Sequence, residues 1–148
     1  MTAIERRWPI LVGLAVALIV FDPLLTGPVS PPLLVHHIEH SLILLLAGLL
    51  GIAYARSHPR RYGDPTALLG VILLASLSVL LMLPDIYSGV DAYPILHALL
   101  HLGFALTGYF GGYLAERYSP RAGTVWTMLV VMMGVITASG FGSPPPHL

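Results

Sequence analysis

Two pairs of histidines are the side chains in this sequence that are best suited to chemistry. The first pair is His36 and His40, in HHIEHSLILLLAGLLG, and the second is His97 and His101, in HALLHLGFALTGYFGG. A spacing of four residues places both imidazoles of a pair on one face of a helix. Neutral imidazole is a good ligand for copper, zinc and iron, so four imidazoles at one depth could hold a single metal ion.

The same four histidines are open to other chemistry. Two of them could be the axial ligands of one b-type haem, or a histidine and an aspartate could exchange protons with a quinol. Glu39 and Asp85 could each orient a histidine as an outer carboxylate partner. The structural alternative is that the histidines are only hydrated at a membrane surface.

The composition limits the kind of protein to which these histidines belong. Hydrophobic residues make up 56% of the 148 residues and charged residues only 9%, whereas soluble domains carry about 25% charged residues. The formal net charge of zero gives no basic field for nucleic acid. With no cysteine, thiolate metal sites and disulfides are excluded. No nucleophile–base pair and no phosphate loop is found, so we predict no catalytic residue and no independent hydrolase or kinase.

The elements that must position the histidines are long apolar segments. A membrane-spanning helix needs about 20 mostly apolar residues, and the long, non-alternating runs argue against strands. We predict an all-α polytopic membrane bundle, one domain over residues 1–148, with its spans separated by prolines. The five predicted spans are Pro9–Leu25, Leu33–Ala55, Thr66–Leu83, Pro94–Ala115 and Ala122–Phe141.

Arginine placement predicts the orientation of this bundle. All seven basic residues are arginines, and they precede the first span or lie in the loops that follow the second and fourth spans. Cytoplasmic loops carry an excess of positive charge. The N-terminus is therefore predicted to be cytoplasmic in a multi-pass plasma-membrane protein. Both histidine pairs then lie in the external third of the membrane.

A shift of 61 residues aligns the chain with itself. His36 falls on His97, His40 on His101 and Gly51 on Gly112. The further matches are Pro23 with Pro84, Arg56 with Arg117, Pro59 with Pro120 and Arg60 with Arg121. Both histidine helices would run in the same direction, so this is a parallel repeat.

Small residues continue each histidine stripe and predict how the two helices meet. Transmembrane helices approach closely along small side chains. One stripe contains His36, His40, Leu44, Ala47, Gly51 and Ala55, and the other contains His97, His101, Ala105, Gly108 and Gly112. Packing along these faces would bring the four imidazoles together.

The stretch from residue 33 to residue 112 resembles the caa3-type CtaG family of cytochrome c oxidase assembly proteins. The resemblance lies in the two His-x-x-x-His motifs, with Pro84 and Tyr87 before the second motif and Phe104 and Gly108 after it. The chain departs from the family pattern at Leu81 and Met82, where the family has Trp-His, and in having five predicted spans rather than seven.

The resemblance implies a reduced, five-helix relative that holds copper and helps to metallate a haem-copper respiratory oxidase. The expected partners are lipid and other membrane subunits, possible neighbours being a terminal oxidase or a quinol-oxidising complex. The alternatives are a haem- or quinol-binding subunit of such a complex, or an accessory subunit that only fills a gap.

Overall fold

The computed structural model describes residues 3–26, 33–58, 62–81, 90 and 93–140, with side chains for 8–22, 38–58, 62–81, 90 and 93–136. These residues form five long α-helices and contain no strand. The helices are α1 (Ala3–Thr26), α2 (Leu33–Arg56), α3 (Pro65–Leu81), α5 (Pro94–Tyr118) and α6 (Pro120–Gly140). The all-α prediction is confirmed, and each predicted span overlaps one helix.

The helix boundaries differ from the prediction mainly between α5 and α6. A loop was expected from residue 116 to residue 121, but only Ser119 separates the two helices. Proline is favoured in the first turn of a helix, which allows α6 to begin at Pro120. The Ser119 hydroxyl also accepts a hydrogen bond from the Ala122 N–H at 3.0 Å, which caps the new helix.

Two of the helices are long and apolar enough to cross a membrane, namely Ile38–Arg56 in α2 and Pro94–Tyr118 in α5. The apolar stretches of α1, α3 and α6 whose side chains are described are shorter, at 10–17 residues each. Two spanning helices are therefore supported, and the five-span arrangement is taken up below as a proposal.

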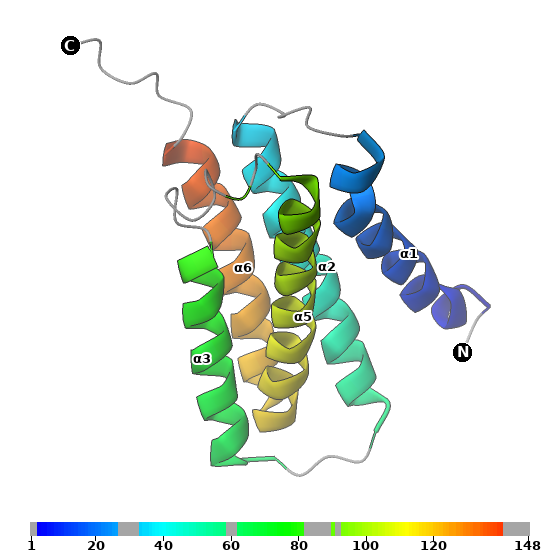
Figure 1. Cartoon of the computed structure of the whole chain (residues 1–148). Helices are drawn as coiled ribbons and strands as arrows, with labels where there is room; N and C mark the ends of the chain where they lie inside the picture. The colour runs from blue at the N-terminus through cyan, green and yellow to red at the C-terminus, as the bar shows by residue number, and fades with distance from the viewer. Residues whose placement is uncertain (1–2, 27–32, 59–61, 82–89, 91–92, 141–148) are drawn as a thin grey trace.

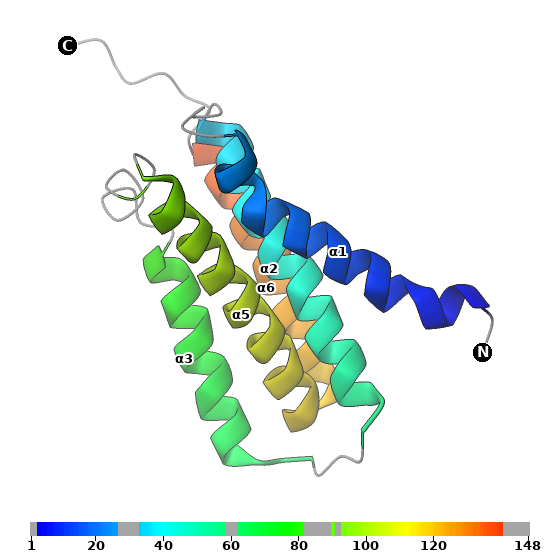
Figure 2. The same ribbon diagram turned by 45° about the vertical axis from the view of Figure 1, so that its right-hand side comes forward.

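The two histidine helices lie side by side at the centre of the bundle and run in the same direction (Figures 1 and 2). α1, α3 and α6 run the opposite way around them. α1 and α6 each contact both central helices, whereas α3 packs against α5. The parallel course expected for the two histidine helices is confirmed. Arg56, Arg117 and Arg121 lie at one common end of the bundle, because α2 and α5 finish there and α6 begins there.

Glycines let the backbones of α2 and α5 touch. A Cβ added to Gly108 would lie 2.5 Å from the Leu44 carbonyl oxygen, closer than real Cβ atoms approach. Cβ atoms on Gly51 or Gly112 would overlap main-chain atoms of the facing helix in the same way. The predicted small-residue interface is therefore confirmed at Gly51, Gly108 and Gly112, where main-chain atoms rather than side chains set the distance between the helices.

These contacts are reciprocal across the 61-residue offset. Gly51 faces the Tyr109 carbonyl, and Gly112 faces the Gly48 carbonyl. Adding 61 to 51 and to 48 gives 112 and 109, so each contact is the exchanged copy of the other. Such reciprocity is the property of a two-fold interface between identical surfaces. The two segments that align at this offset thus meet through equivalent positions of α2 and α5.

Candidate metal centre

Three of the four predicted histidines come together between α2 and α5. His40, His97 and His101 are buried, with exposed fractions of 0%, 7% and 1%. One ring nitrogen from each lies within 4.8 Å of the others. His97 and His101 occupy successive turns of α5, and His40 reaches them from α2, so the cluster depends on the contact between the two helices.

The spacing within the cluster suits a small metal ion. The Nε2 atoms of His97 and His101 are 3.1 Å apart. Two imidazole nitrogens bound to one tetrahedral Zn²⁺ at their usual bond lengths would be about 3.3 Å apart. The ring centroid of His40 lies 4.9 Å from that of His101 and 6.4 Å from that of His97. The His40 ring is thus nearer to His101 than to His97.

A backbone carbonyl fixes the ring of His101 from outside the cluster. Its Nδ1 lies 3.0 Å from the Ile19 carbonyl oxygen of α1. A carbonyl can only accept, so Nδ1 carries the proton and donates it. In a neutral imidazole this leaves the lone pair on Nε2, which faces His97. Metal-binding histidines commonly have such a partner on the other nitrogen.

Apolar side chains enclose the cluster. The ring of Phe104 lies 4.5 Å from that of His40. Leu44, Leu100 and Val20 are buried in the same core. Burying imidazoles in an apolar environment is costly unless they have polar partners, and here His101 contacts both His97 and the Ile19 carbonyl. The convergence of three such rings makes the cluster a candidate metal site.

The remaining predicted site residues are placed only in part. The backbone of His36 belongs to α2, but its side chain, like the whole of Asp85, lies outside the described residues. Glu39 is half-buried and directly precedes His40. The outer partner observed for His101 is the Ile19 carbonyl, whereas a carboxylate was the expected type of partner.

Sequence reasoning missed an ion pair between the exposed Arg56 and the buried Glu116, at the opposite end of the same two helices. Glu116 is 1% exposed, and its carboxylate accepts two hydrogen bonds from Arg56, at 3.1 and 3.2 Å. The pair joins the last turn of α2 to that of α5. No local sequence signal connects these two residues, which are 60 positions apart.

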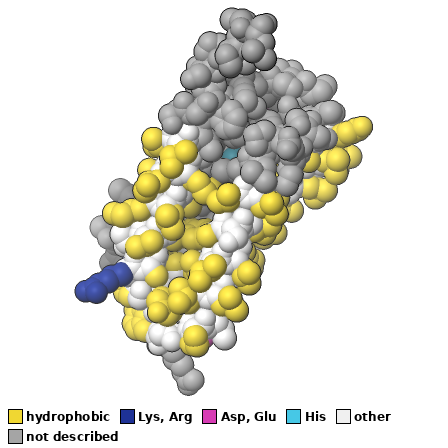
Figure 3. All heavy atoms as spheres, turned by 90° about the vertical axis from the view of Figure 1, so that its left-hand side faces the viewer, with side chains coloured by type: hydrophobic (Ala, Val, Ile, Leu, Met, Phe, Trp, Pro, Cys, Tyr) yellow, Lys and Arg dark blue, Asp and Glu magenta, His cyan; other side chains and the backbone are white. Residues whose placement is uncertain are grey.

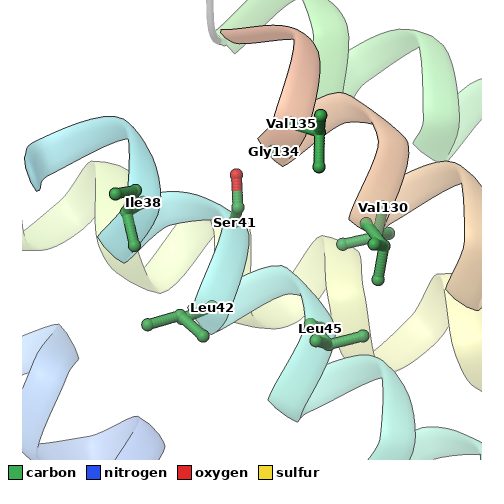
Figure 4. A pocket seen from close by; sticks show the side chains of 8 residues that line it. Ile38, Ser41, Leu42, Leu45, Val130, Gly134 and Val135 are labelled. Carbon is green, nitrogen blue, oxygen red and sulfur yellow. The ribbon is translucent and has the colours of Figure 1, made fainter. Parts of the chain in front are cut away.

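A surface groove on the bundle lacks metal-binding side chains. It lies between α2 and α6, has a volume of about 280 Å³ and is lined mainly by aliphatic side chains with Ser41 near Gly134 (Figure 4). Its lining contains no histidine and no charged side chain. The groove is therefore separate from the histidine cluster.

Comparison with known proteins finds no matching family model, no matching curated protein and no matching solved structure.

Proposed function

We propose that this chain is an integral membrane protein of five spans that holds one metal ion near the outer face through His40, His97 and His101. Copper is the proposed ion, and metallation or assembly of a haem-copper respiratory oxidase is the proposed role. The observation that carries the proposal is the convergence of three buried imidazoles from two repeat-related helices. The choice of copper and of an oxidase comes from the family resemblance.

The tight contact of α2 with α5 favours a compact ion over a haem. The two backbones touch at Leu44 and Gly108, and Leu44 is one helical turn from His40. The rings of His97 and His101 also pack with centroids 4.5 Å apart. A porphyrin between the helices would have to separate both contacts, whereas a single ion bound by imidazole nitrogens would not.

The outer surface of the bundle supports a membrane location for all five helices. Large hydrophobic side chains are exposed on α1, α3 and α6 as well as on the two central helices, for example Leu18, Leu73 and Met132. Hydrophobic atoms dominate the described surface on the side of α3 and α6 (Figure 3). Exposed apolar surface of this extent is typical of a lipid or protein contact. The arginines at one end would then mark the cytoplasmic side.

Metal analysis of the purified protein tests the proposed ion site. The protein in mild detergent should bind one equivalent of copper, and His40→Ala and His101→Ala should each weaken binding strongly. His58→Ala is the matched control, because His58 is exposed at the opposite end of α2 and contacts the Tyr54 carbonyl. A Soret band in the visible spectrum would contradict the copper proposal in favour of haem. Absence of any metal would leave an accessory structural role.

Cysteine labelling tests the proposed topology. The sequence has no cysteine, so single-cysteine variants report one position each. Ser30→Cys and Ser88→Cys should react with an impermeant reagent from outside intact cells, and Ser57→Cys only after the membrane is opened. The reverse pattern would place the histidine cluster on the cytoplasmic side.

A further inference from the structure

The Ile19 carbonyl can accept a hydrogen bond from His101 because a proline, Pro23, follows one turn later in α1. In a helix, the carbonyl of residue i accepts a hydrogen bond from the N–H of residue i+4. The residue four positions after Ile19 is Pro23, which has no N–H. The Ile19 carbonyl therefore has no donor from this position, although both residues belong to the helix Ala3–Thr26.

This carbonyl is directed at the histidine cluster. It lies 3.0 Å from Nδ1 of His101, which is 82 residues away in the sequence. The adjacent residue, Val20, is buried in the same core as Leu44 and Phe104. α1 therefore contacts the site through its backbone.

We propose that Pro23 and the Ile19 carbonyl are positioning groups that hold His101 in its Nδ1–H form, with the Nε2 lone pair facing His97. The expected effect on metal affinity rests on the proposed function. The expected position of the imidazole proton applies to the metal-free protein as well. α1 thereby becomes part of the site without contributing a side-chain ligand.

The form of His101 can be observed directly. In metal-free protein with ¹⁵N-labelled histidine, the His101 resonances, assigned with His101→Gln, should show a proton on Nδ1 and a bare Nε2. A proton on Nε2 with a bare Nδ1 in the wild-type protein would overturn the inference. This measurement on the unaltered chain remains decisive if a variant fails to fold.

Pro23→Ala supplies the missing N–H, which should compete with His101 for the Ile19 carbonyl. We expect the Nε2–H form of His101 to become populated and metal affinity to fall about 10–100-fold, as is typical when an outer partner is lost. Pro9→Ala is the matched control, because it makes the same change in the same helix where the carbonyl concerned is that of Glu5. Helicity and micelle size should be unchanged in both variants.

The outcomes separate this inference from the proposed function. An unchanged His101 spectrum in folded Pro23→Ala would overturn the positioning role. If Pro9→Ala altered the His101 spectrum as much as Pro23→Ala does, a general effect of helix bending would explain the change, and the positioning role would be overturned. A spectral change in Pro23→Ala, in a protein that binds no metal at all, would support the positioning role and remove the proposed function.

Discussion

Nε2 of His97 faces Nε2 of His101 at 3.1 Å, on successive turns of one buried helix. Because the Ile19 carbonyl assigns the His101 proton to Nδ1, the shared contact in neutral, metal-free protein is an N–H of His97 donating to His101. An ion bound between the two rings would require His97 to release this proton or to carry it on Nδ1 instead. The α5 pair thus supplies two of the three proposed ligands, and His40 of α2 supplies the third.

The first prediction concerns the number of histidine ligands. His40 belongs to the cluster of three ring nitrogens, so His40→Ala should lower metal affinity more than ~100-fold, beyond the usual cost of losing an outer partner. His36→Ala, one turn earlier, should have an effect no larger than the ~10–100-fold of such a partner. Competition with a chelator of known affinity measures both. Equal losses in the two variants would indicate a four-histidine site instead.

The second prediction concerns the contact between α2 and α5. Gly51→Ala would place a methyl group against the Tyr109 main chain, which cannot swing aside as a side chain can. Overpacking of this kind typically costs about 1–3 kcal/mol in the free energy of unfolding. Gly13→Ala is the control, since a Cβ there meets no atom within 4 Å. Unfolding by a denaturing detergent measures both, and equal stability of the two variants would refute the prediction.

The third prediction concerns the ion pair at the arginine end. Arg56→Ala removes two hydrogen bonds from a carboxylate that is 1% exposed, so we expect a loss of about 1–3 kcal/mol in unfolding free energy. Adding Glu116→Gln should recover part of the loss, because a neutral amide is less costly to bury than a charge. Arg121→Ala, at an exposed position on the same end, is the control. A loss no greater than that of Arg121→Ala would show that the pair adds nothing.

The fourth prediction concerns the start of α3 and its dependence on pH. The Asp64 carboxylate accepts hydrogen bonds from the Thr66 hydroxyl at 2.6 Å and the Thr66 N–H at 2.9 Å. These bonds, the hydroxyl's first, lower the pKa of Asp64 below its ordinary value. The folded state therefore favours the ionised form, and the carboxylate stabilises the fold at any pH above that ordinary value. This stabilisation is lost as the pH falls through the lowered pKa.

Asp64→Ala should consequently be less stable than the wild-type protein at neutral pH. The difference should shrink as the solution is acidified through the pKa of the folded state. Thermal unfolding of both proteins across an acidic pH series measures this. Thr66→Ala removes only the hydroxyl and should show a weaker form of the same trend. A stability difference that stays constant down to the most acidic condition would contradict the assignment.

Much of the bundle could be predicted from the sequence because its signals are local. Apolar runs interrupted by prolines gave all five helices. The stripe through His40, Leu44 and Gly51 predicts the buried face of α2. The corresponding stripe of α5 predicts the buried face of that helix in the same way. Small residues at helical spacing identify a face on which backbones can approach, and the main-chain contact at Gly108 is the result.

The other contacts of the site depend on which further helix packs against α2 and α5. The spacing of apolar residues along one helix does not say which helix that is. The Ile19 carbonyl is a backbone group, so no side chain in the sequence marks it as a partner of His101. The one sequence feature that indicates a free acceptor there is Pro23, which lacks the N–H four residues later. Glu116 was missed for the related reason that its partner comes from another helix. Trp126 of α6 fills the space beside Gly48 and Gly111, a fit that follows from the three-dimensional arrangement alone.

In the proposed metal site, the main-chain contact of α2 with α5 would also limit the size of the ion that can bind. Side chains can rotate to suit a ligand, but two helix backbones already in contact cannot move closer together. The contact at Leu44 is one helical turn from His40 and therefore limits how closely α2 can bring that ring to the α5 pair. A larger ion would have to push the helices apart, and a smaller one could not draw them together. Discrimination by ionic radius would thus be set by glycines that never touch the ion.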